Sequence, residues 1–355
     1  MRISHFLKRD NNNLDLIRLI LACLVIVGHL PILNGDDKLW IDPIGHFFTF
    51  TYSAAWSVKL FFFISGLLVT NSLLSKKSVT QFLLSRIFRI IPALFFVLII
   101  TTFIIGPLVT AVSVSTYFSN LGHLKYIFNN LLFKTDYYLP GVFSNNLYKD
   151  VVNGSLWSLS YEVECYIALL GSFLILQHQK PVYWKYVVLI ILADTILPYK
   201  FIVGWLGKNP DIYLLPAIFS FGALLAVYAD HVEANWKMAS GLFLLFFILK
   251  NSDFVHITFI LASCLLLIPI ASNKWILKFK LRYDLSYGVY LWGFLVQQTL
   301  YHYWGHISAA LHCLVALIIS IILAFITHIW IEKPFMEFGR YVYDRVKTSM
   351  LFNKA

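Results

Sequence analysis

The side chains of this sequence that could do chemistry are the ionisable ones inside its apolar stretches. Arg18 and His29 lie in one such stretch, Lys59 lies in a second, and Glu162 and Glu164 open a third. A charged group in an apolar stretch is costly and by default marks a functional path or a buried pair. Histidine is the side chain best suited to moving a proton near neutral pH. His29 is therefore the main candidate for proton transfer.

The spacing of Arg18 and His29 places both side chains on one face of a helix. Eleven residues make almost three turns, which separates the two groups by about 16 Å along the axis. A polar face would then join the two ends of this helix. A structural explanation is also open, in which Asp15 pairs with Arg18 near the membrane surface and His29 bonds to a neighbouring helix.

Arg86 and Arg89 form a second candidate cluster, three residues apart and just before an apolar run with Pro92 in its first turn. Paired guanidinium groups suit phosphates through bidentate hydrogen bonds. The retention of basic residues on the cytoplasmic side of a membrane explains the same pair without any ligand.

Glu162 and Glu164 are two carboxylates within one helical turn, which is difficult to explain as packing alone. The alternative is a solvated helix start, with Trp157 at the membrane interface and acids favoured by the helix dipole. Ser65 and its neighbouring glycine would allow close helix packing. The long side chain of Lys59 can extend its ammonium group outward.

The elements that must position these residues are membrane-spanning helices. Hydrophobic residues make up 59% of the chain and charged residues 13%, which excludes an ordinary soluble domain. The long apolar runs favour helices over a barrel, because lipid offers no partner for open backbone groups. At about 20 residues per span, the sequence predicts an all-α bundle of about ten transmembrane helices, at 14–33, 53–74, 90–112, 157–177, 184–198, 211–229, 238–250, 254–271, 285–303 and 308–331.

The distribution of basic residues predicts that both termini are cytoplasmic. With the N-terminus inside, basic clusters such as 76–77, 86–89 and 274–282 fall on the inner side of the membrane. The net charge of +10 then reflects topology and anionic lipid, with no nucleic-acid partner expected. We expect one transmembrane domain over 1–337 and a basic cytoplasmic tail over 338–355. The long outer segment 113–156 is a candidate for function.

No metal site is expected from the sequence. The four cysteines lie inside predicted helices without a C-x-x-C pattern, and His302 and His306 lack the H-E-x-x-H context of a zinc site. We interpret these two histidines as belonging to the end of a helix near the membrane surface.

Six motifs, taken together and in order, resemble the acyltransferase 3 family of bacterial membrane acyltransferases. The resemblance covers residues 12–336, nearly the whole chain. The motifs are L-D-L-I-R followed by His29, K-L-F-F-F-I-S-G from Lys59, R-x-x-R-I-x-P from Arg86, L-W-S-L-S-Y-E-V-E-C-Y from Leu156, L-S-Y-G-V-Y-L-W from Leu285, and I-E-K-P-F from Ile331.

This resemblance implies an enzyme that moves an acyl group, usually acetyl from cytoplasmic acetyl-CoA, to a sugar hydroxyl. The acceptor would be a cell-surface or lipid-linked polysaccharide such as O-antigen or capsule, and the location the bacterial inner membrane. Acyl-CoA, the glycan and the lipid bilayer are the expected partners. The basic inner pole would attract the phosphates of CoA, and His29 and Glu162 would face the arriving glycan.

The reaction needs a base for the acceptor hydroxyl and exclusion of water from the thioester. We expect His29 to be the general base or a transient acyl carrier, Glu162 to orient it or the acceptor, and Arg18 to contact the donor. The remaining candidates follow from motif position or from aromatic character: Arg86, Arg89 and Ser65 on the donor side, and Trp157, Tyr166, Lys59, Tyr137 and Tyr138 on the acceptor side.

One position departs from the family pattern, because many relatives have histidine where this sequence has Gly293. The rival interpretation from another class is a transporter or flippase of a lipid-linked glycan. Such proteins tend to show internal repeats and interrupted helices in matching halves, and neither is found in the sequence. A non-catalytic subunit that docks an enzyme would leave the placement of His29 and Glu162 unexplained.

Overall fold

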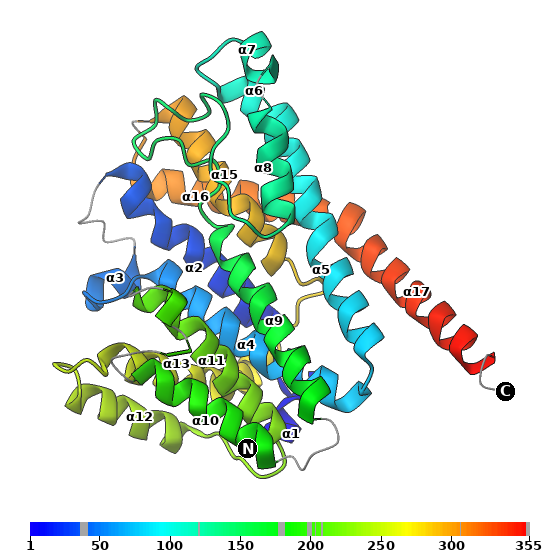
Figure 1. The fold of residues 1–355 in the computed structure, drawn as a ribbon. Coiled ribbons are helices and arrows are strands. Elements are labelled where there is room, and N and C mark those ends of the chain that lie inside the picture. Colours follow the sequence, from blue (N-terminus) through cyan, green and yellow to red (C-terminus); the bar gives the residue numbers. More distant parts are fainter. Residues whose placement is uncertain are drawn as a thin grey trace. The chain divides into compact units, whose positions relative to one another are not determined.

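The computed structural model describes residues 1–35, 42–119, 121–176, 182–196, 201–202, 204–206, 209–305 and 307–352. Within these residues the chain is helical, with two isolated bridges and no strand. Figure 1 follows the helices along the chain from α1 in blue to α17 in red. The all-α prediction is therefore confirmed for the part of the chain that the structure describes.

The chain forms two compact units, each built from three segments. Unit 1 contains residues 1–21, 43–77 and 161–284, and unit 2 contains 22–42, 78–160 and 285–355. Helices α2 (Leu14–Asn34) and α9 (Trp157–Leu176) contribute residues to both units. The candidate site residues are therefore distributed over these two units.

The core of unit 1 is the packing of α4 (Ser53–Lys76) against α11 (Pro210–Val227). Small residues allow this approach, because a Cβ on Gly66 would lie 2.0 Å from the Phe219 carbonyl oxygen, and one on Gly222 would lie 2.3 Å from that of Phe63. The other elements of unit 1 are α1 (Ile3–Phe6), η1 (Arg9–Asn11), α3 (Pro43–Phe47), α10 (Val182–Ile196), η3 (Gly204–Leu206), α12 (Trp236–Ile248), α13 (Val255–Ala271) and α14 (Lys274–Leu277).

In unit 2, α15 (Ser286–Trp304) packs against α16 (Ala309–Thr327), and α5 (Val79–Ile100) packs against α17 (Lys333–Phe352). A Cβ on Gly339 of α17 would lie 2.6 Å from the ring of Phe88 on α5, so this glycine permits the contact. The shorter elements are η2 (Thr101–Ile105), α6 (Gly106–Val109), α7 (Val114–Ser119), α8 (Gly122–Leu131) and η4 (His328–Glu332).

Two of these elements, η2 and η4, are single π-helical turns inside longer helices. A π turn inserts into the regular hydrogen-bond ladder and is frequent at functional sites. In η2 the carbonyl of Thr102 accepts a hydrogen bond from the buried Tyr117 hydroxyl. A Cβ on Gly106 would lie 2.3 Å from that hydroxyl, so the glycine leaves room for the tyrosine side chain.

Polar caps explain where several helices begin. The side chain of Ser78 accepts from the Gln81 amide at the start of α5, and the side chain of Asn235 accepts from the Met238 amide at the start of α12. Such caps satisfy donors that a helix start leaves unpaired.

Six helical stretches among the described residues are long and apolar enough to cross a membrane: Leu14–Asn34, Ser53–Lys76, Val79–Val109, Trp157–Ile175, Pro210–Val227 and Ala309–Ser349. Shorter apolar helices lie at Tyr186–Thr195, Trp236–Ile248 and Val255–Ala271. The predicted total of about ten spans and the cytoplasmic placement of both termini stay predictions.

Two predicted boundaries were wrong. The third helix begins at Val79 rather than at 90, because Ser78 caps it and its first turns carry polar residues. Arg86 and Arg89 therefore lie within α5 and not before it. The segment 113–156, predicted to lie on the outer side, contains the short helices α7 and α8. The helix predicted over 308–331 continues through η4 into α17, so the predicted tail 338–355 is helical as far as Phe352.

Candidate functional site

Glu162, Ser65 and Tyr166 form a hydrogen-bonded trio in unit 1. Ser65 on α4 donates through Oγ to Glu162 Oε1 at 2.9 Å, and the Tyr166 hydroxyl donates to the same oxygen. The Ser65 and Tyr166 hydroxyl oxygens are 2.8 Å apart. Glu162 and Tyr166 are four residues apart on α9, so they share a face, whereas Glu164 is exposed. The two carboxylates thus have different surroundings.

Lys59 is buried and paired in unit 1. Its ammonium group donates to the Asp211 carboxylate, and the lysine side chain is 4% exposed. The expected outward extension of Lys59 is therefore wrong, because Asp211 in the first turn of α11 supplies a counter-charge inside the protein. Burial of an ion pair requires such a partner to offset desolvation.

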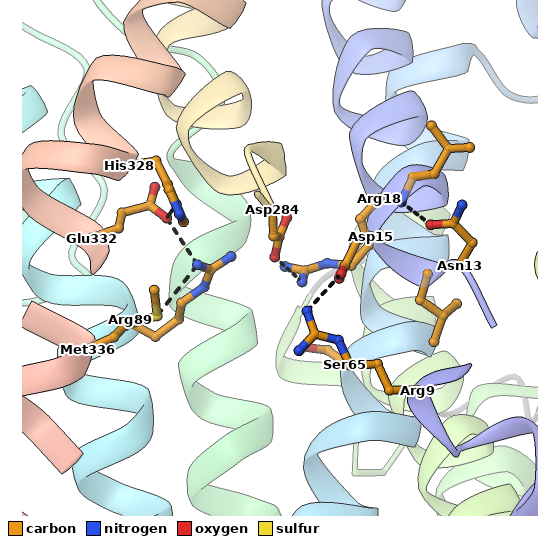
Figure 2. A network of polar contacts seen from close by, with 12 residues as sticks. Arg9, Asn13, Asp15, Arg18, Ser65, Arg89, Asp284, His328, Glu332 and Met336 are labelled. Atoms are coloured by element: carbon orange, nitrogen blue, oxygen red, sulfur yellow. Dashed lines mark hydrogen bonds and ion pairs between the residues drawn. The ribbon is translucent and has the colours of Figure 1, made fainter. Parts of the chain in front are cut away.

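Arg18 also has an acidic partner in unit 1. Its guanidinium donates to Asp284 Oδ2 at 2.6 Å, while Asp15 lies 3.9 Å from Arg9 (Figure 2). The Asn13 amide donates to the carbonyl oxygens of Ile276 and Phe279 in the segment leading to Asp284. The start of α2 is thereby fixed to α14 and to the residues that follow it.

Arg89 belongs to a buried cluster in unit 2. Its guanidinium donates to Glu332 Oε2 at 3.0 Å, and His328 Nδ1 lies 3.2 Å from the same oxygen (Figure 2). The side chain of Glu332 is fully buried, and its Oε1 has no hydrogen-bond partner among the described residues. The ring of Tyr287 lies under the guanidinium at 5.8 Å. The π turn η4 carries both His328 and Glu332 and so brings them to Arg89.

Arg86 has different surroundings from Arg89. It is only half-buried, and its Nε donates to Ser85 Oγ at a long 3.4 Å. Arg89 thus binds a fully buried carboxylate, whereas the contact of Arg86 with Ser85 lies at the surface.

His29 lies in unit 2 against the ring of Phe294 on α15. The two rings meet edge to face, with centroids 5.1 Å apart. The Nδ1 atom of His29 is buried and has no hydrogen-bond partner among the residues that the structure describes. A buried ring nitrogen without a partner is destabilising by about 1–3 kcal/mol, so this atom is a strong candidate for a bond made during function.

The position of Gly293 next to α2 explains why this residue has no side chain. A Cβ there would lie 2.6 Å from Cγ1 of Ile26, one turn before His29. The histidine that many relatives were expected to carry at this position has no room here.

The segment 113–156 is attached to α15 by buried polar contacts within unit 2. Asn146 donates to the side chain of Gln298, and Asn153 donates to the Leu291 carbonyl. Just after the segment, Ser158 Oγ in the first turn of α9 lies 2.6 Å from the Tyr290 hydroxyl. These bonds explain how a long connection can keep a defined conformation.

Two aromatic candidates, Tyr137 and Tyr138, lie on the same segment, and Trp157 is the first residue of α9. Tyr138 is 51% exposed, Tyr137 is also exposed, and Trp157 is half-buried. Both tyrosines therefore have ring surface available for stacking. Elsewhere in the segment, burial raises the pKa of the Tyr126 hydroxyl, which has no hydrogen-bond partner among the described residues.

Unit 1 brings together Ser65, Glu162 and Tyr166, whereas His29 belongs to unit 2. The contact expected between His29 and Glu162 stays a prediction.

Sequence reasoning missed the partners Asp211, Asp284, Glu332 and His328, and the buried amide of Gln297. The rule that ionisable residues in apolar runs have a function could have found His328. Nothing distinguished Gln297, because a neutral amide carries no charge to notice.

The sequence was compared with those of known proteins. A family model described as an acyltransferase domain matches residues 11–329, which include all the candidate residues named from the sequence. An O-acetyl transferase of Shigella phage Sf6 is 29% identical over 307 residues, covering 81% of this chain and 85% of that protein. Nodulation protein 10 of Rhizobium leguminosarum bv. viciae is 28% identical over 322 residues, covering 81% of this chain and 83% of that protein. No solved structure matches the chain.

Proposed function

Because the chain belongs to the acyltransferase 3 family, we propose that it transfers an acetyl group from acetyl-CoA to a hydroxyl of a cell-surface or lipid-linked glycan. The family and the apolar helices make it a membrane acyltransferase. The name of the relative from Shigella phage Sf6, an O-acetyl transferase, supports acetyl as the group and oxygen as the acceptor atom. We place the activity in the inner membrane of a bacterium.

The observation that carries the chemical assignment is the buried Nδ1 of His29, which lacks a partner among the described residues. A histidine can exist with one ring nitrogen protonated and the other free to accept a proton. In the proposed step, His29 takes the proton of the acceptor hydroxyl while the hydroxyl oxygen attacks the thioester carbonyl. The C–O bond forms, the C–S bond breaks, and the proton passes from His29 to the departing thiolate of CoA.

Glu162 is proposed to orient the acceptor. Ser65 and Tyr166 both donate to its Oε1, which fixes the carboxylate plane before any substrate binds. Preorganised polar groups stabilise a transition state without having to reorganise during the reaction. Tyr137, Tyr138 and Trp157 would add aromatic surface for sugar rings.

The donor side is proposed to depend more on Arg86 than on Arg89. Arg86 presents a charge near the surface, whereas the charge of Arg89 is balanced by Glu332. A phosphate of CoA would reach the half-buried guanidinium of Arg86 more readily than that of Arg89, which is bound to a fully buried carboxylate. Arg18, paired with Asp284, is proposed to contact the donor as well.

The test is a transfer assay on the purified protein in lipid nanodiscs. Release of free CoA is measured with and without glycan acceptors, and the products are examined by NMR for new acetyl esters. We expect acceptor-dependent release by the wild type, loss of release in His29→Ala, and retained release in the control His302→Ala. A wild type that neither binds nor consumes acetyl-CoA contradicts the proposal and favours glycan transport. Equal consumption by wild type and His29→Ala removes His29 from the mechanism.

A further inference from the structure

The side chain of Gln297 is fully buried in unit 2 and faces α2. Its Nε2 donates to the carbonyl oxygen of Ile26 at 2.8 Å. Carbonyl groups of a helix point toward its C-terminal end, so the amide of Gln297 lies at the level of the next turn of α2. His29, three residues after Ile26, lies in that turn.

The contacts of α2 with α15 run in matching pairs. Gln297 contacts Ile26, and Phe294, three residues earlier on α15, contacts His29. Residues three apart are neighbours on one face of a helix, with Cβ atoms about 5–6 Å apart. His29 and Gln297 therefore occupy adjacent positions between the two helices.

The orientation of the Gln297 amide is fixed by chemistry. Only its NH₂ group can face the Ile26 carbonyl, because two oxygen acceptors would repel each other. Its Oε1 must then point away from Ile26. This oxygen is buried and has no hydrogen-bond partner among the described residues, as is also true of His29 Nδ1.

We propose that Gln297 is the positioning residue of His29, an inference that rests on the proposed function. In the active protein, Nδ1–H of His29 donates to Gln297 Oε1, directly or through one water. This bond selects the tautomer whose Nε2 is free to accept the proton of the acceptor hydroxyl. It also removes two unsatisfied buried atoms at once, each of which is destabilising by about 1–3 kcal/mol.

The backbone around Gln297 is held in place from α16. His312 Nε2 lies 3.0 Å from the Gln297 carbonyl oxygen, and His312 Nδ1 lies 3.0 Å from Asn34 Oδ1 on α2. The three helices are thus joined by polar contacts around His29. A base whose orientation depends on one amide needs such a fixed frame, because small displacements of reacting groups are costly.

The first test reads the tautomer of His29 without any acyl donor. ¹⁵N NMR of histidine-labelled protein, with the His29 signals identified by their loss in His29→Asn, shows which ring nitrogen carries the proton. We expect protonated Nδ1 in the wild type and a change of tautomer in Gln297→Leu. Gln298→Leu is the matched control, because the amide of Gln298 faces Asn146 and the carbonyls of Tyr148 and Val151. An unchanged His29 tautomer in Gln297→Leu overturns the proposal, even if the protein proves to be an acetyltransferase.

The second test is a double-mutant cycle on acetyl transfer. Gln297→Leu should lower kcat by about 10- to 100-fold, the effect seen when the partner that orients a metal-bound histidine is removed. KM for both substrates should stay near the wild-type value, and Gln297→Glu, which keeps an oxygen acceptor, should retain more activity. In a His29→Ala background, Gln297→Leu should have no further effect. If the two substitutions lower the rate by factors that multiply, Gln297 acts independently of His29, and the proposal is overturned.

Discussion

The guanidinium of Arg89 donates to the carboxylate of Glu332 at 3.0 Å, and the Glu332 side chain is fully buried. Removing one partner of a buried pair leaves an uncompensated charge, which is destabilising by about 3–5 kcal/mol. Arg89→Gln should therefore lower the melting temperature strongly, whereas Arg86→Gln should melt near the wild type and raise KM for acetyl-CoA. Thermal unfolding in detergent and donor titration measure these effects. Wild-type melting of Arg89→Gln would argue against a structural pair.

Glu162 and Glu164 should differ in their effect on activity. Glu162 accepts hydrogen bonds from Ser65 and Tyr166, and Glu164 is exposed. A misplaced catalytic group can lower the rate about 100-fold, so we expect Glu162→Gln to reduce acetyl transfer by about that factor. Glu164→Gln, two residues away on the same helix, should retain the wild-type rate. Similar losses of activity in both variants would show that the total negative charge at the start of α9 matters, and not the position of Glu162.

Lys59 and Asp211 should behave as a coupled pair. Lys59→Met leaves a carboxylate without its partner, and Asp211→Leu leaves a nearly fully buried ammonium group. Each single change should be destabilising by about 3–5 kcal/mol, while the double variant should be much less affected because no lone charge remains. Denaturation of all four proteins gives the coupling energy. Additive losses would show that the two side chains do not stabilise each other.

Close packing of α4 on α11 predicts that alanine is too large at position 66. Its Cβ would meet the Phe219 carbonyl oxygen, a backbone atom that cannot move aside easily. Overpacking of this kind is destabilising by about 1–3 kcal/mol. Gly171→Ala on α9 is the control, because a Cβ there has no atom within 4 Å. Equal melting temperatures for both variants would show that the two helices can separate without cost.

Most helices could be predicted from the sequence because long apolar runs in a membrane protein must be helical. The start of α5 was misplaced by about a dozen residues, from 90 to Val79, because its first turns carry serine and arginine and interrupt the apolar pattern. Conversely, Arg18, Lys59 and Arg89 could be recognised because a charge inside or beside an apolar run is conspicuous.

Their partners could not be recognised. Asp284 is 266 residues from Arg18, Glu332 is 243 from Arg89, and Asp211 is 152 from Lys59. Such pairs are created by the packing of helices far apart in the chain, and no local pattern encodes them. The basic residues inside or beside apolar runs could be identified from the sequence, whereas their acidic partners could be identified only from the structure.

The π turn at His328–Glu332 joins α16 to α17 and affects the direction in which the side chains of α17 point. With 3.6 residues per turn, each residue advances the direction of a side chain by about 100°. Because a π turn holds one residue more than a regular turn for about the same rotation, deleting one residue from it would restore a regular helix and keep Gly339 facing Phe88. A deletion between this turn and Gly339 would instead rotate everything after it by about that angle. A one-residue deletion in α17 before Gly339 should therefore be more harmful than the same deletion within the π turn.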